Sequence, residues 1–429
     1  MENVEQVVRM GLCNGCGVCA LMCPSKAIKI VKDNVKGVYL PIIAEERCEN
    51  CGLCLEACFG TKPYESSSIR DNWEDFVIGK FLNFYVGHAC DRDIRYNSSS
   101  GGIITALSLH ILDEGIVDGI LVTRMSEQNP LEPELFIATS KSEVLSASRS
   151  KYCPVPLGVK FESILKKKGR CAIVGLPCHI YGARKAEALY PNLAAKIPLH
   201  LGIFCSGTPN FLATEYLLRR LRIKKEQIVR IEYRGEGWPG NMTIEFQHPD
   251  VPGKRNLQIP YPKYWEGLDF LFHPHRCTLC DDRFNRLADL SCGDAWLPEY
   301  QNDTLGTSLI ITRNEVGERL LTAACEKGYI QVKSVHSVLR LGQAQKLIRT
   351  LQMRIRIQEA LGKPLPPRYS AYMSANRELN SPTLGEYTYS IFFNLMRIAA
   401  SKRYLWNLLD LYLTGKRFAK RLKIASRGG

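Results

Sequence analysis

Hydrophobic and polar positions along residues 63–360 switch repeatedly between the period of a strand and the period of a helix. Residues 97–115 (NSSSGGIITALSLHILDEG) carry apolar residues at helical spacing after a small polar run, in which Ser98 or Ser99 is expected to cap the helix. A β-rich run begins at Gly119. Three further stretches each predict a strand followed by a loop or helix: RCAIVGLPCHIYGARKA (170–186), PLHLGIFCSGTP (198–209) and TSLIITRNEVGERLLTAAC (307–325). This alternation predicts an α/β body with a mostly parallel sheet that helices cover on both faces.

A β-excursion interrupts this alternation between residues 230 and 272. Its first part, RIEYRGEGWPGNMTIEFQHPD, predicts two strands joined by a glycine–proline turn, with Met242, Ile244 and Phe246 alternating along the second strand. The excursion either covers a bound cofactor or forms plain β-core, and its pattern fits both interpretations.

The last part of the chain divides into a linker and a helical tail. Residues 361–388 are rich in proline and small polar residues, which is typical of a linker. Residues 389–429 have apolar positions at helical spacing, and from Arg397 onward they hold nine Lys or Arg against one acid, Asp410. The aromatic residues of this tail include Tyr404, Trp406 and Phe418. Such a basic amphipathic helix fits an anionic membrane surface, a groove on a partner protein, or ordinary packing against the body.

The overall composition is that of a globular protein with a basic balance. The chain has 429 residues, enough for two or three domains, with 45% hydrophobic and 23% charged residues. Its formal net charge of +14 favours acidic partners such as anionic lipid or an acidic redox protein. Nucleic acid is not expected, because the sequence has no known binding module. No apolar stretch is long enough to span a membrane and no secretory signal is evident, so we expect a cytoplasmic protein, peripheral at the inner membrane face through its tail.

The 17 cysteines change this picture, because thiols in a chain without a secretory signal predict metal ligands and not disulfides. Residues 1–62 contain the run C-x2-C-x2-C-x3-C twice, the spacing of two-cluster ferredoxins, in which the fourth cysteine of each run binds the other cluster. One 4Fe–4S cluster is then expected on Cys13, Cys16, Cys19 and Cys58, and the other on Cys48, Cys51, Cys54 and Cys23. Structural zinc is the alternative, although zinc sites rarely use this doubled run. Residues 1–62 are thus predicted to relay electrons.

Half of a third site stands at Cys277 and Cys280, which have two residues between them. In parallel α/β sheets, ligands gather where loops leave the carboxyl ends of the strands. Cys178 and Cys205 each follow closely after a predicted strand, so both are expected at the same edge of the sheet. We therefore predict a third centre held by these four thiolates.

Other assignments of these cysteines stay open. A zinc site built from His273, His275, Cys277 and Cys280 is one alternative. Cys153 and Cys292 are reserve ligands. Because a lone cysteine in an apolar body is usually a packing residue, we expect that role for Cys90, Cys171 and Cys325.

With these residues the chain resembles a known family. The segments SSSGGIITAL, SKYCP, VGLPCHIYG, GIFCSGTPN, EYRGEGWPG, CTLCDD, ADLSCGDAW and GTSLIITR follow the order seen in the coenzyme F(420) hydrogenase/dehydrogenase beta-subunit family, whose relatives include a plant 7-hydroxymethyl chlorophyll a reductase. The resemblance covers roughly residues 1–345. It implies that residues 63–360 bind FAD and a nearby third 4Fe–4S cluster, fed by the ferredoxin domain. The cysteines that match the family's motifs are Cys178, Cys205, Cys277 and Cys280.

A flavin needs a place for its pyrophosphate, a wall for its ring and a proton donor. Backbone amides at a helix N-terminus suit the phosphates, and the candidates are Ser100, Gly101 and Gly102. Charge and an aromatic side chain are offered by Arg149, Ser150, Lys151 and Tyr152. A glycine pair can also serve only to let a helix pack closely. His179 and Asp294 are candidate proton donors, and each is equally well explained as a structural residue.

Clusters that move single electrons, combined with a flavin that can pass a hydride, suit the reduction of an organic substrate. The sequence therefore predicts an iron–sulfur flavoprotein oxidoreductase that is supplied by reduced ferredoxin or another redox partner. Its SSSGG segment is closer to family members found among polysaccharide-synthesis proteins. The alternatives are a non-catalytic electron-transfer subunit of a larger complex, an oxidoreductase subunit for the deazaflavin coenzyme F(420), and a metal-stapled interaction protein without flavin.

Overall fold

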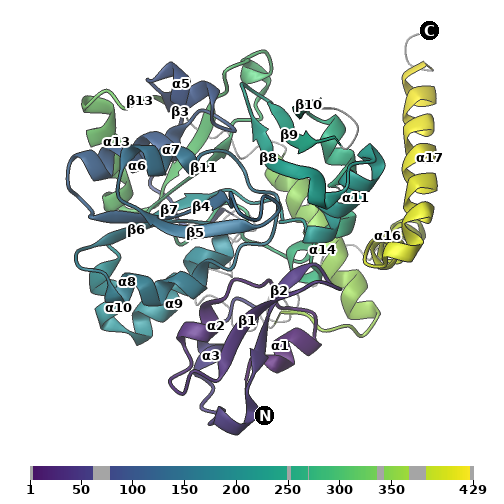
Figure 1. Ribbon diagram of the computed structural model, residues 1–429, viewed down its shortest axis with the longest axis horizontal. Helices are drawn as coiled ribbons and strands as arrows, with labels where there is room; N and C mark the ends of the chain where they lie inside the picture. The colour runs from purple at the N-terminus through teal and green to yellow at the C-terminus, as the bar shows by residue number, and fades with distance from the viewer. Residues whose placement is uncertain are drawn as a thin grey trace.

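The computed structural model describes residues 3–60, 78–248, 253–268, 270–335, 343–366 and 383–425. Figure 1 shows an N-terminal domain, a central sheet with helices on both faces, and a second, smaller sheet beside the C-terminal helices. This arrangement confirms the expected fold class. The polar link after residue 60 and most of the expected linker, residues 367–382, lie outside the described residues.

The N-terminal domain is a small unit in which two cysteine runs flank an antiparallel hairpin, β1 with β2. Its elements are α1 (Glu5–Arg9), α2 (Val18–Leu21), β1 (Ile28–Asp33), β2 (Val38–Ile43), a 3-10 turn (Glu45–Arg47) and α3 (Leu53–Glu56). Gly17 and Gly52 occupy the same place in the two runs, directly before α2 and α3, with φ of +82° and +74°. Because only glycine adopts this backbone readily, each run can turn sharply after its second cysteine.

The central sheet has eight strands in the order β13-β3-β12-β11-β7-β6-β4-β5. The strands are β3 (Asn83–Ala89), β4 (Gly119–Met125), β5 (Pro133–Ala138), β6 (Cys171–Gly175), β7 (Leu199–Ile203), β11 (Leu290–Asp294), β12 (Ser308–Thr312) and β13 (Ile330–Ser334). β4, β6, β7 and β11 run parallel in the middle, and antiparallel strands extend both edges. The sheet is therefore mixed, with the expected parallel strands confined to its centre. Cys178 and Cys205 follow the carboxyl ends of β6 and β7, two strands of this parallel centre.

Helices cover both faces of the central sheet (Figure 1). One face carries α5 (Arg92–Tyr96), α6 (Ile103–Asp113), α7 (Lys141–Ser146) and α13 (Glu315–Glu326), and the other carries α8 (Phe161–Lys166), α9 (Pro177–Leu189) and α10 (Pro191–Lys196). Leu107, Ile120 and Ile310 are buried on the first face, and Ile173 and Ala183 on the second. Burying apolar side chains on both faces explains why the central strands read as continuous hydrophobic runs.

The N-terminus of α6 corrects one expectation. Ser98 and Ser99 do not cap this helix, since Gly102 occupies the cap position with φ of +79° and no side chain caps the helix. The hydroxyl of Ser98 instead donates to the carbonyl oxygen of Ile94, at 2.7 Å. A Cβ on Gly102 would also stand 3.2 Å from the Cβ of Ala89, so this position favours glycine through both backbone and space.

The β-excursion forms a separate antiparallel sheet, β10-β9-β8. Its elements are β8 (Ile228–Gly235), β9 (Asn241–Gln247), β10 (Lys254–Pro260) and 3-10 turns at Lys263–Gly267 and Phe270–Phe272, with α11 (Phe211–Leu221) packed beside them. Met242 and Ile244 are fully buried against α11, while Phe246 is half-buried. The two predicted strands are therefore present, and the alternation along β9 makes one face of the small sheet a core.

The C-terminal part is helical: α14 (Gln343–Ala360), α16 (Leu384–Ala400), a 3-10 turn (Arg403–Leu405) and α17 (Trp406–Ala425). α16 begins at Leu384, inside the range expected for the linker, because Thr383 and Glu386 form a capping box there. Trp406 is buried, and its indole N–H donates to the carbonyl oxygen of Ala400. Its expected place on a membrane-facing surface is therefore wrong, whereas Tyr404 is 79% exposed.

Among the described residues, each helix is either too short or too polar to cross a bilayer.

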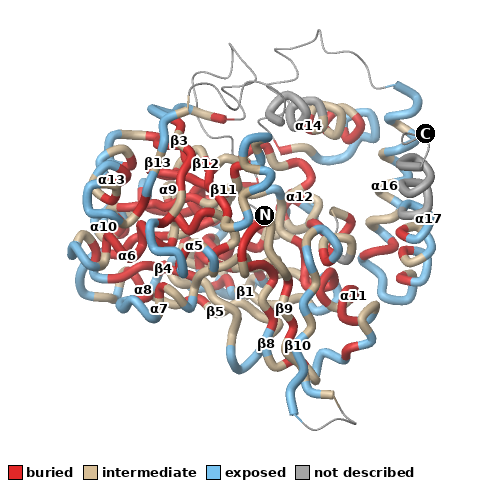
Figure 2. The backbone as a smooth tube through the Cα atoms, turned by 90° about the horizontal axis from the view of Figure 1, so that it is seen from above, coloured by how far each residue is buried: buried red, intermediate tan, exposed pale blue. Residues whose placement is uncertain are grey.

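The N-terminal domain packs against the body (Figure 1), and the buried stretches, in red in Figure 2, concentrate in the central sheet and the helices around it. The amide of Gly158 donates to the carbonyl oxygen of Cys16 at 2.8 Å, and a Cβ on Gly158 would stand 2.4 Å from the nitrogen of Val18. The amide of Phe211 donates to the carbonyl oxygen of Gly37 at 2.8 Å. Contacts this close need a fixed orientation of the two parts, which places the first cysteine run against the body.

Candidate functional site

The eight N-terminal thiols gather into two sets that mix the two runs. Burial, with a contribution from the neighbouring Cys58 thiol, raises the pKa of Cys13 and of Cys16 to about 12. Burial also raises the pKa of Cys54, together with the thiols of Cys51, Cys23 and Cys48. Cys58 thus lies with the first run and Cys23 with the second, as in a domain whose fourth cysteines are exchanged.

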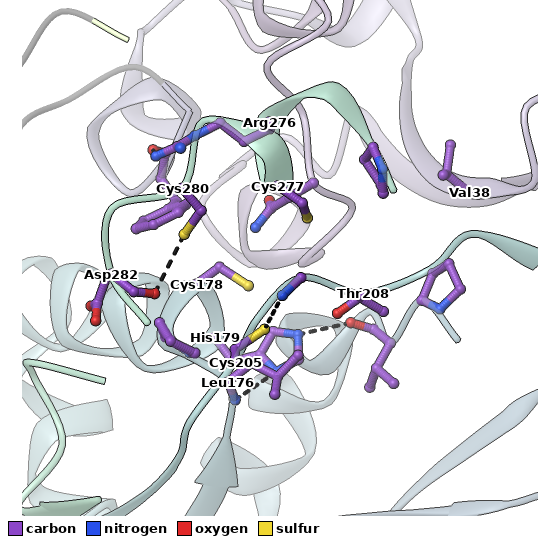
Figure 3. Close-up of a pocket in the computed structure, with 17 residues that line it drawn as sticks. Val38, Leu176, Cys178, His179, Cys205, Thr208, Arg276, Cys277, Cys280 and Asp282 are labelled. Carbon is purple, nitrogen blue, oxygen red and sulfur yellow. Dashed lines mark hydrogen bonds between the residues drawn. The ribbon is translucent and has the colours of Figure 1, made fainter. Parts of the chain in front are cut away.

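A second gathering of thiols, which we call the thiol pocket, lies between the N-terminal domain and the central sheet (Figure 3). Cys178 comes from the first turn of α9, and Cys205 follows two residues after the end of β7. Cys277 lies in the short helix α12 (His275–Thr278), and Cys280 follows it. All four thiols line the pocket, with Cys178 and Cys205 facing Cys277 and Cys280. The structure therefore brings together four cysteines that span more than 100 residues of sequence.

The thiols of this pocket are free and electrostatically coupled. Burial raises the pKa of Cys178 well above its ordinary value, and Cys16, Cys205, Cys277 and Cys280 add to the increase. Four such thiols can lose their protons together only if cations compensate the charge, which is what iron in a cysteine-bound cluster does. In the described part of the chain, no three Cys, His, Asp or Glu side chains form a group suited to one metal ion. Four thiols spaced around a pocket suit a cluster of several atoms.

The alternative ligands lie elsewhere. His273 packs against Phe270, with ring centroids 4.8 Å apart, and His275 places its Nδ1 3.4 Å from Nη1 of Arg397. Neither histidine is among the residues that line the thiol pocket. The reserve cysteines Cys153 and Cys292 are both buried, and neither lines the thiol pocket. Cys292 lies on β11, in the core under α6.

The thiol pocket adjoins the first N-terminal set. Asn14, Val38 and Phe59 of the N-terminal domain line it, and the Cys16 thiol acts on the pKa of Cys178. Within the N-terminal domain, Cys54 of the second set acts in the same way on Cys19 of the first. The three sets of thiols therefore follow one another in space, from Cys54 through Cys19 and Cys16 to Cys178, with neighbouring sets in electrostatic contact.

The two candidate proton donors are both engaged by protein groups. His179 is buried in the pocket wall, with Nδ1 3.2 Å from the amide nitrogen of Leu176 and Nε2 2.9 Å from the carbonyl oxygen of Val155. Burial lowers the pKa of His179 to about 4, so the ring is neutral near pH 7. Asp294 accepts both guanidinium N–H groups of Arg234, at 2.7 and 2.9 Å, and the indole N–H of Trp238 at 2.8 Å. A catalytic role for either residue stays a prediction.

The glycine pair before α6 packs tightly against the sheet. The amide of Gly101 donates to the hydroxyl oxygen of Ser308 at 3.0 Å, and a Cβ there would stand 2.6 Å from the carbonyl oxygen of Gly87. Ser100 contacts Ser308 through its own hydroxyl at 3.0 Å. Close packing alone is thus enough to explain the glycine at position 101. Phosphate binding by Ser100, Gly101 and Gly102 stays a prediction.

The segment Arg149–Tyr152 lies beside this loop. The amide and hydroxyl of Ser150 both donate to Oγ of Ser99, at 2.8 and 2.9 Å, and Arg149 pairs with Glu232 of β8. The ammonium of Lys151 is directed at the carbonyl oxygens of Ser148 and Arg149, at 2.7 and 2.9 Å. Burial lowers the pKa of Lys151 to about 7. The predicted flavin residues thus share one neighbourhood.

An aromatic wall, which the sequence analysis did not single out, completes this neighbourhood. It consists of Tyr152, Trp238, Tyr261, Trp265 and Trp296. Tyr152 lies 4.8 Å from Trp265, and Trp238 lies 4.6 Å from Trp296, between ring centroids. Three of the five tryptophans of the chain fall between residues 238 and 296, which is the signal that could have located the wall. Pro154, two residues after Tyr152, lines the thiol pocket, so a short stretch of chain joins the wall to the pocket.

Comparison with protein families agrees with this organisation. Residues 12–59 match the 4Fe–4S dicluster domain. Residues 84–159 match the N-terminal part, and residues 168–338 the C-terminal part, of the coenzyme F(420) hydrogenase/dehydrogenase beta subunit.

Individual relatives give the same result. The coenzyme F(420) hydrogenase subunit beta of Methanothermobacter thermautotrophicus is 27% identical over 303 residues, which cover 68% of this chain and 99% of the relative. A subunit of the F(420)H(2) dehydrogenase of Methanosarcina mazei is 24% identical, over 74% of this chain and 83% of the relative. A chain of the F(420)-reducing NiFe hydrogenase complex from Methanosarcina barkeri shares the fold, with a TM-score of 0.52 at 21% identity, over 70% of this chain and 99% of that chain. The chain belongs to the coenzyme F(420) hydrogenase/dehydrogenase beta-subunit family.

Proposed function

We propose that this protein is an iron–sulfur flavoprotein oxidoreductase. Electrons enter at the two ferredoxin-type clusters, pass a third 4Fe–4S cluster held by Cys178, Cys205, Cys277 and Cys280, and reach FAD beside the aromatic wall. The observation that supports this path most strongly is the thiol pocket, which is lined both by the N-terminal domain and by the body. A flavin supplies the conversion of single electrons into hydride transfer.

The chain's own residues have separate tasks in this proposal. The backbone around Cys205 directs an amide at sulfur, since the N–H of Gly207 points to Sγ at 3.4 Å. Such hydrogen bonds raise the potential of a cysteine-bound cluster. Tyr152 and Trp265 would shield one side of the flavin ring from water. Arg149 and Lys151 would contact the phosphates after giving up their present partners, Glu232 and backbone carbonyl oxygens respectively. His179 and Asp294 remain the candidate proton donors.

The substrate is proposed from relatives. Because several relatives carry the names F(420) hydrogenase, F(420)H(2) dehydrogenase and F(420)-dependent sulfite reductase, the deazaflavin coenzyme F(420) is the first acceptor to test. An organic intermediate of surface polysaccharide synthesis is the second. Since relatives are named as subunits, transfer to a catalytic partner protein without turnover by this chain alone is the competing proposal.

Anaerobic purification of the full chain tests the proposal. We expect about twelve irons and one FAD per chain, and reduction of coenzyme F(420) or another organic acceptor when dithionite supplies electrons. Cofactor analysis and stopped-flow absorption spectroscopy measure these quantities. About eight irons without flavin would contradict the proposed path, whereas full cofactor content without turnover would favour the electron-transfer subunit.

We further propose that the C-terminal helices hold the protein on an anionic membrane. α16 exposes Leu384, Tyr389, Ile391, Phe392, Leu395 and Ile398, and the following segment exposes Tyr404, Leu408 and Leu411. These side chains form the outer apolar face. Eight Lys or Arg lie from residue 402 onward against Asp410, and Arg219 of α11 pairs with that acid at 2.8 Å. Apolar side chains beside net positive charge complement an anionic bilayer.

Replacing Ile391, Leu395 and Ile398 by Asp is expected to reduce binding to phosphatidylglycerol vesicles at least about tenfold, because the three exposed side chains lie on one helix face. Vesicle co-sedimentation at low salt measures the effect. Phosphatidylcholine vesicles serve as the neutral control. Equal binding by the wild type and the triple variant would rule out this surface as the docking site.

A further inference from the structure

Four arginines lie near Cys277 and Cys280: one of them lines the thiol pocket, and the other three bind backbone carbonyl oxygens of segments that carry pocket cysteines. They are Arg276 of α12, Arg283 after Cys280, Arg354 of α14 and Arg397 of α16, and we call them the arginine cluster. Arg276 is 2% exposed, and the other three are half-buried. Its guanidinium lies 4.3 Å from the ring centroid of Phe59 in the N-terminal domain, so it stands between the first thiol set and the pocket.

The hydrogen-bond partners of these arginines are mostly neutral carbonyl oxygens. Nη2 of Arg397 donates to the carbonyl oxygen of His273 at 2.8 Å, and Nη1 of Arg354 to that of Thr278 at 3.0 Å. Nη1 of Arg283 donates to the carbonyl oxygen of Ser206 at 2.9 Å. Within the described residues, none of these three pairs with a carboxylate, and Nε of both Arg283 and Arg397 is buried without an acceptor.

Such an arrangement is costly unless an anion compensates it. Burial and repulsion by Arg354 lower the pKa of Arg397 to about 10, and the Cys277 thiolate opposes this decrease. Burial raises the pKa of Cys277, and Arg276, Arg283 and Arg397 oppose that increase. Like charges this close indicate an anionic partner, and the thiolates of the pocket are the anions at hand.

Two neighbouring acids offset part of this charge, because both raise the pKa of the Cys280 thiol that Arg276 lowers. Asp281 and Asp282 both pair with Arg286, at 2.7 and 3.6 Å. In the first N-terminal set, by comparison, the cation that lowers a thiol pKa is Lys36, which acts on Cys13. Among the described residues, three arginines thus act on Cys277, whereas one lysine acts on Cys13.

We propose that the arginine cluster makes the third centre the one that an electron from the ferredoxin domain reduces most readily. The inference rests on the proposed function, which assigns a 4Fe–4S cluster to the thiol pocket. One electron leaves the first N-terminal centre, which is oxidised, and arrives at the third centre, which is reduced and gains one negative charge. No bond or proton changes. Cations beside the acceptor stabilise that added charge and raise its reduction potential.

Two of the four arginines come from outside the matched family segments, which end at residue 338. Arg354 and Arg397 lie on α14 and α16, and α14 also places Leu351 and Ile355 in the core of the N-terminal domain. The C-terminal helices α14 and α16 thus place two positive charges near the third centre. Arg354 and Arg397 act through charge on the third centre and are not catalytic residues.

The double variant Arg354→Gln and Arg397→Gln tests this role in the full chain, purified anaerobically and titrated with dithionite under electron paramagnetic resonance. We expect the third centre alone to become harder to reduce, with a roughly tenfold lower share of the electron relative to the first centre, equivalent to about 59 mV. The pair Arg354→Lys and Arg397→Lys keeps both charges and is expected to retain most of the wild-type potential. Arg403→Gln is the matched control, because Arg403 pairs with Glu215 at 2.7 Å away from the pocket.

The outcomes separate the two proposals. About eight irons in the wild type would overturn the third cluster itself, whatever the variants do. About twelve irons in the wild type, with the same potentials in the Gln variant, would overturn the role of the arginine cluster and leave the proposed function intact. Loss of third-centre iron in the Gln variant but not in the Lys variant would support the role of charge, and loss in both would overturn it.

Discussion

Cys178→Ser is expected to remove the third centre and stop electron flow while leaving the ferredoxin domain intact. A serine hydroxyl is a poor ligand for iron, and Cys178 is the thiol of the pocket that the Cys16 thiol influences. Iron should fall from about twelve to about eight per chain. Because the first N-terminal centre then has no neighbour to pass electrons to, dithionite-driven reduction of the acceptor should fall at least about 100-fold. Iron analysis and steady-state turnover measure both effects.

Cys325→Ser is the matched control for this variant. Cys325 is half-buried on α13 and contacts the core under α6, far from the thiol pocket in the sheet order. Its replacement should leave iron content and turnover within about twofold of the wild type. A Cys178→Ser protein with full iron and full turnover would contradict the assignment, and the zinc alternative at Cys277 and Cys280 would return.

Local spacing carried the parts of the site that the sequence could predict. The exchange of Cys23 and Cys58 between the two runs follows from ligand geometry in a short segment, and no long-range information is needed. Cys178 and Cys205 could be predicted as neighbours because parallel strands place their carboxyl ends at one edge of the sheet. The segment that carries Cys277 and Cys280 could be assigned to that edge only because two cysteines need two further ligands, and Cys178 and Cys205 supply them.

The rest of the site depends on contacts that have no local signature. Strand alternation predicts parallel pairing, but the antiparallel edge strands β13, β3 and β12 reach the sheet from both ends of the body. The arginine cluster combines α12 with α14, which was expected to belong to the α/β body, and with α16, which spans the expected linker and the basic tail. A basic residue in a helical pattern is usually a solvated one, and only tertiary packing shows that Arg397 faces His273 and Cys277.

Asp289→Asn is expected to lower the free energy of unfolding by about 3 kcal/mol, the second large effect. The carboxylate is 5% exposed and accepts from the amide of His200 at 2.8 Å, from Arg184 at 2.7 Å and from Asn314 at 2.7 Å. These residues belong to β7, α9 and the start of α13. β7 leads to Cys205 and α9 carries Cys178, so Asp289 joins the two elements that position half of the thiol pocket. An amide at this place removes the shorter of the two ion pairs of the half-buried Arg184, which keeps only Glu187 at 3.5 Å.

The pH dependence distinguishes this charge effect from a loss of shape. Burial alone would raise the pKa of Asp289, but His200 and Arg184 lower it to about 2. A carboxyl whose folded pKa is depressed stabilises the fold above its ordinary value near 4, and this contribution disappears as the pH falls towards 2. Thermal unfolding followed by circular dichroism should therefore show a constant difference between wild type and Asp289→Asn from pH 7 to about pH 4, and a smaller one below.

Glu315→Gln, in an exposed pair with Arg319, is the control and should change stability by less than about 0.5 kcal/mol. A difference that persists unchanged below pH 4 would mean that Asp289 contributes packing and not charge, and the two thiol-bearing elements would then be held by shape alone.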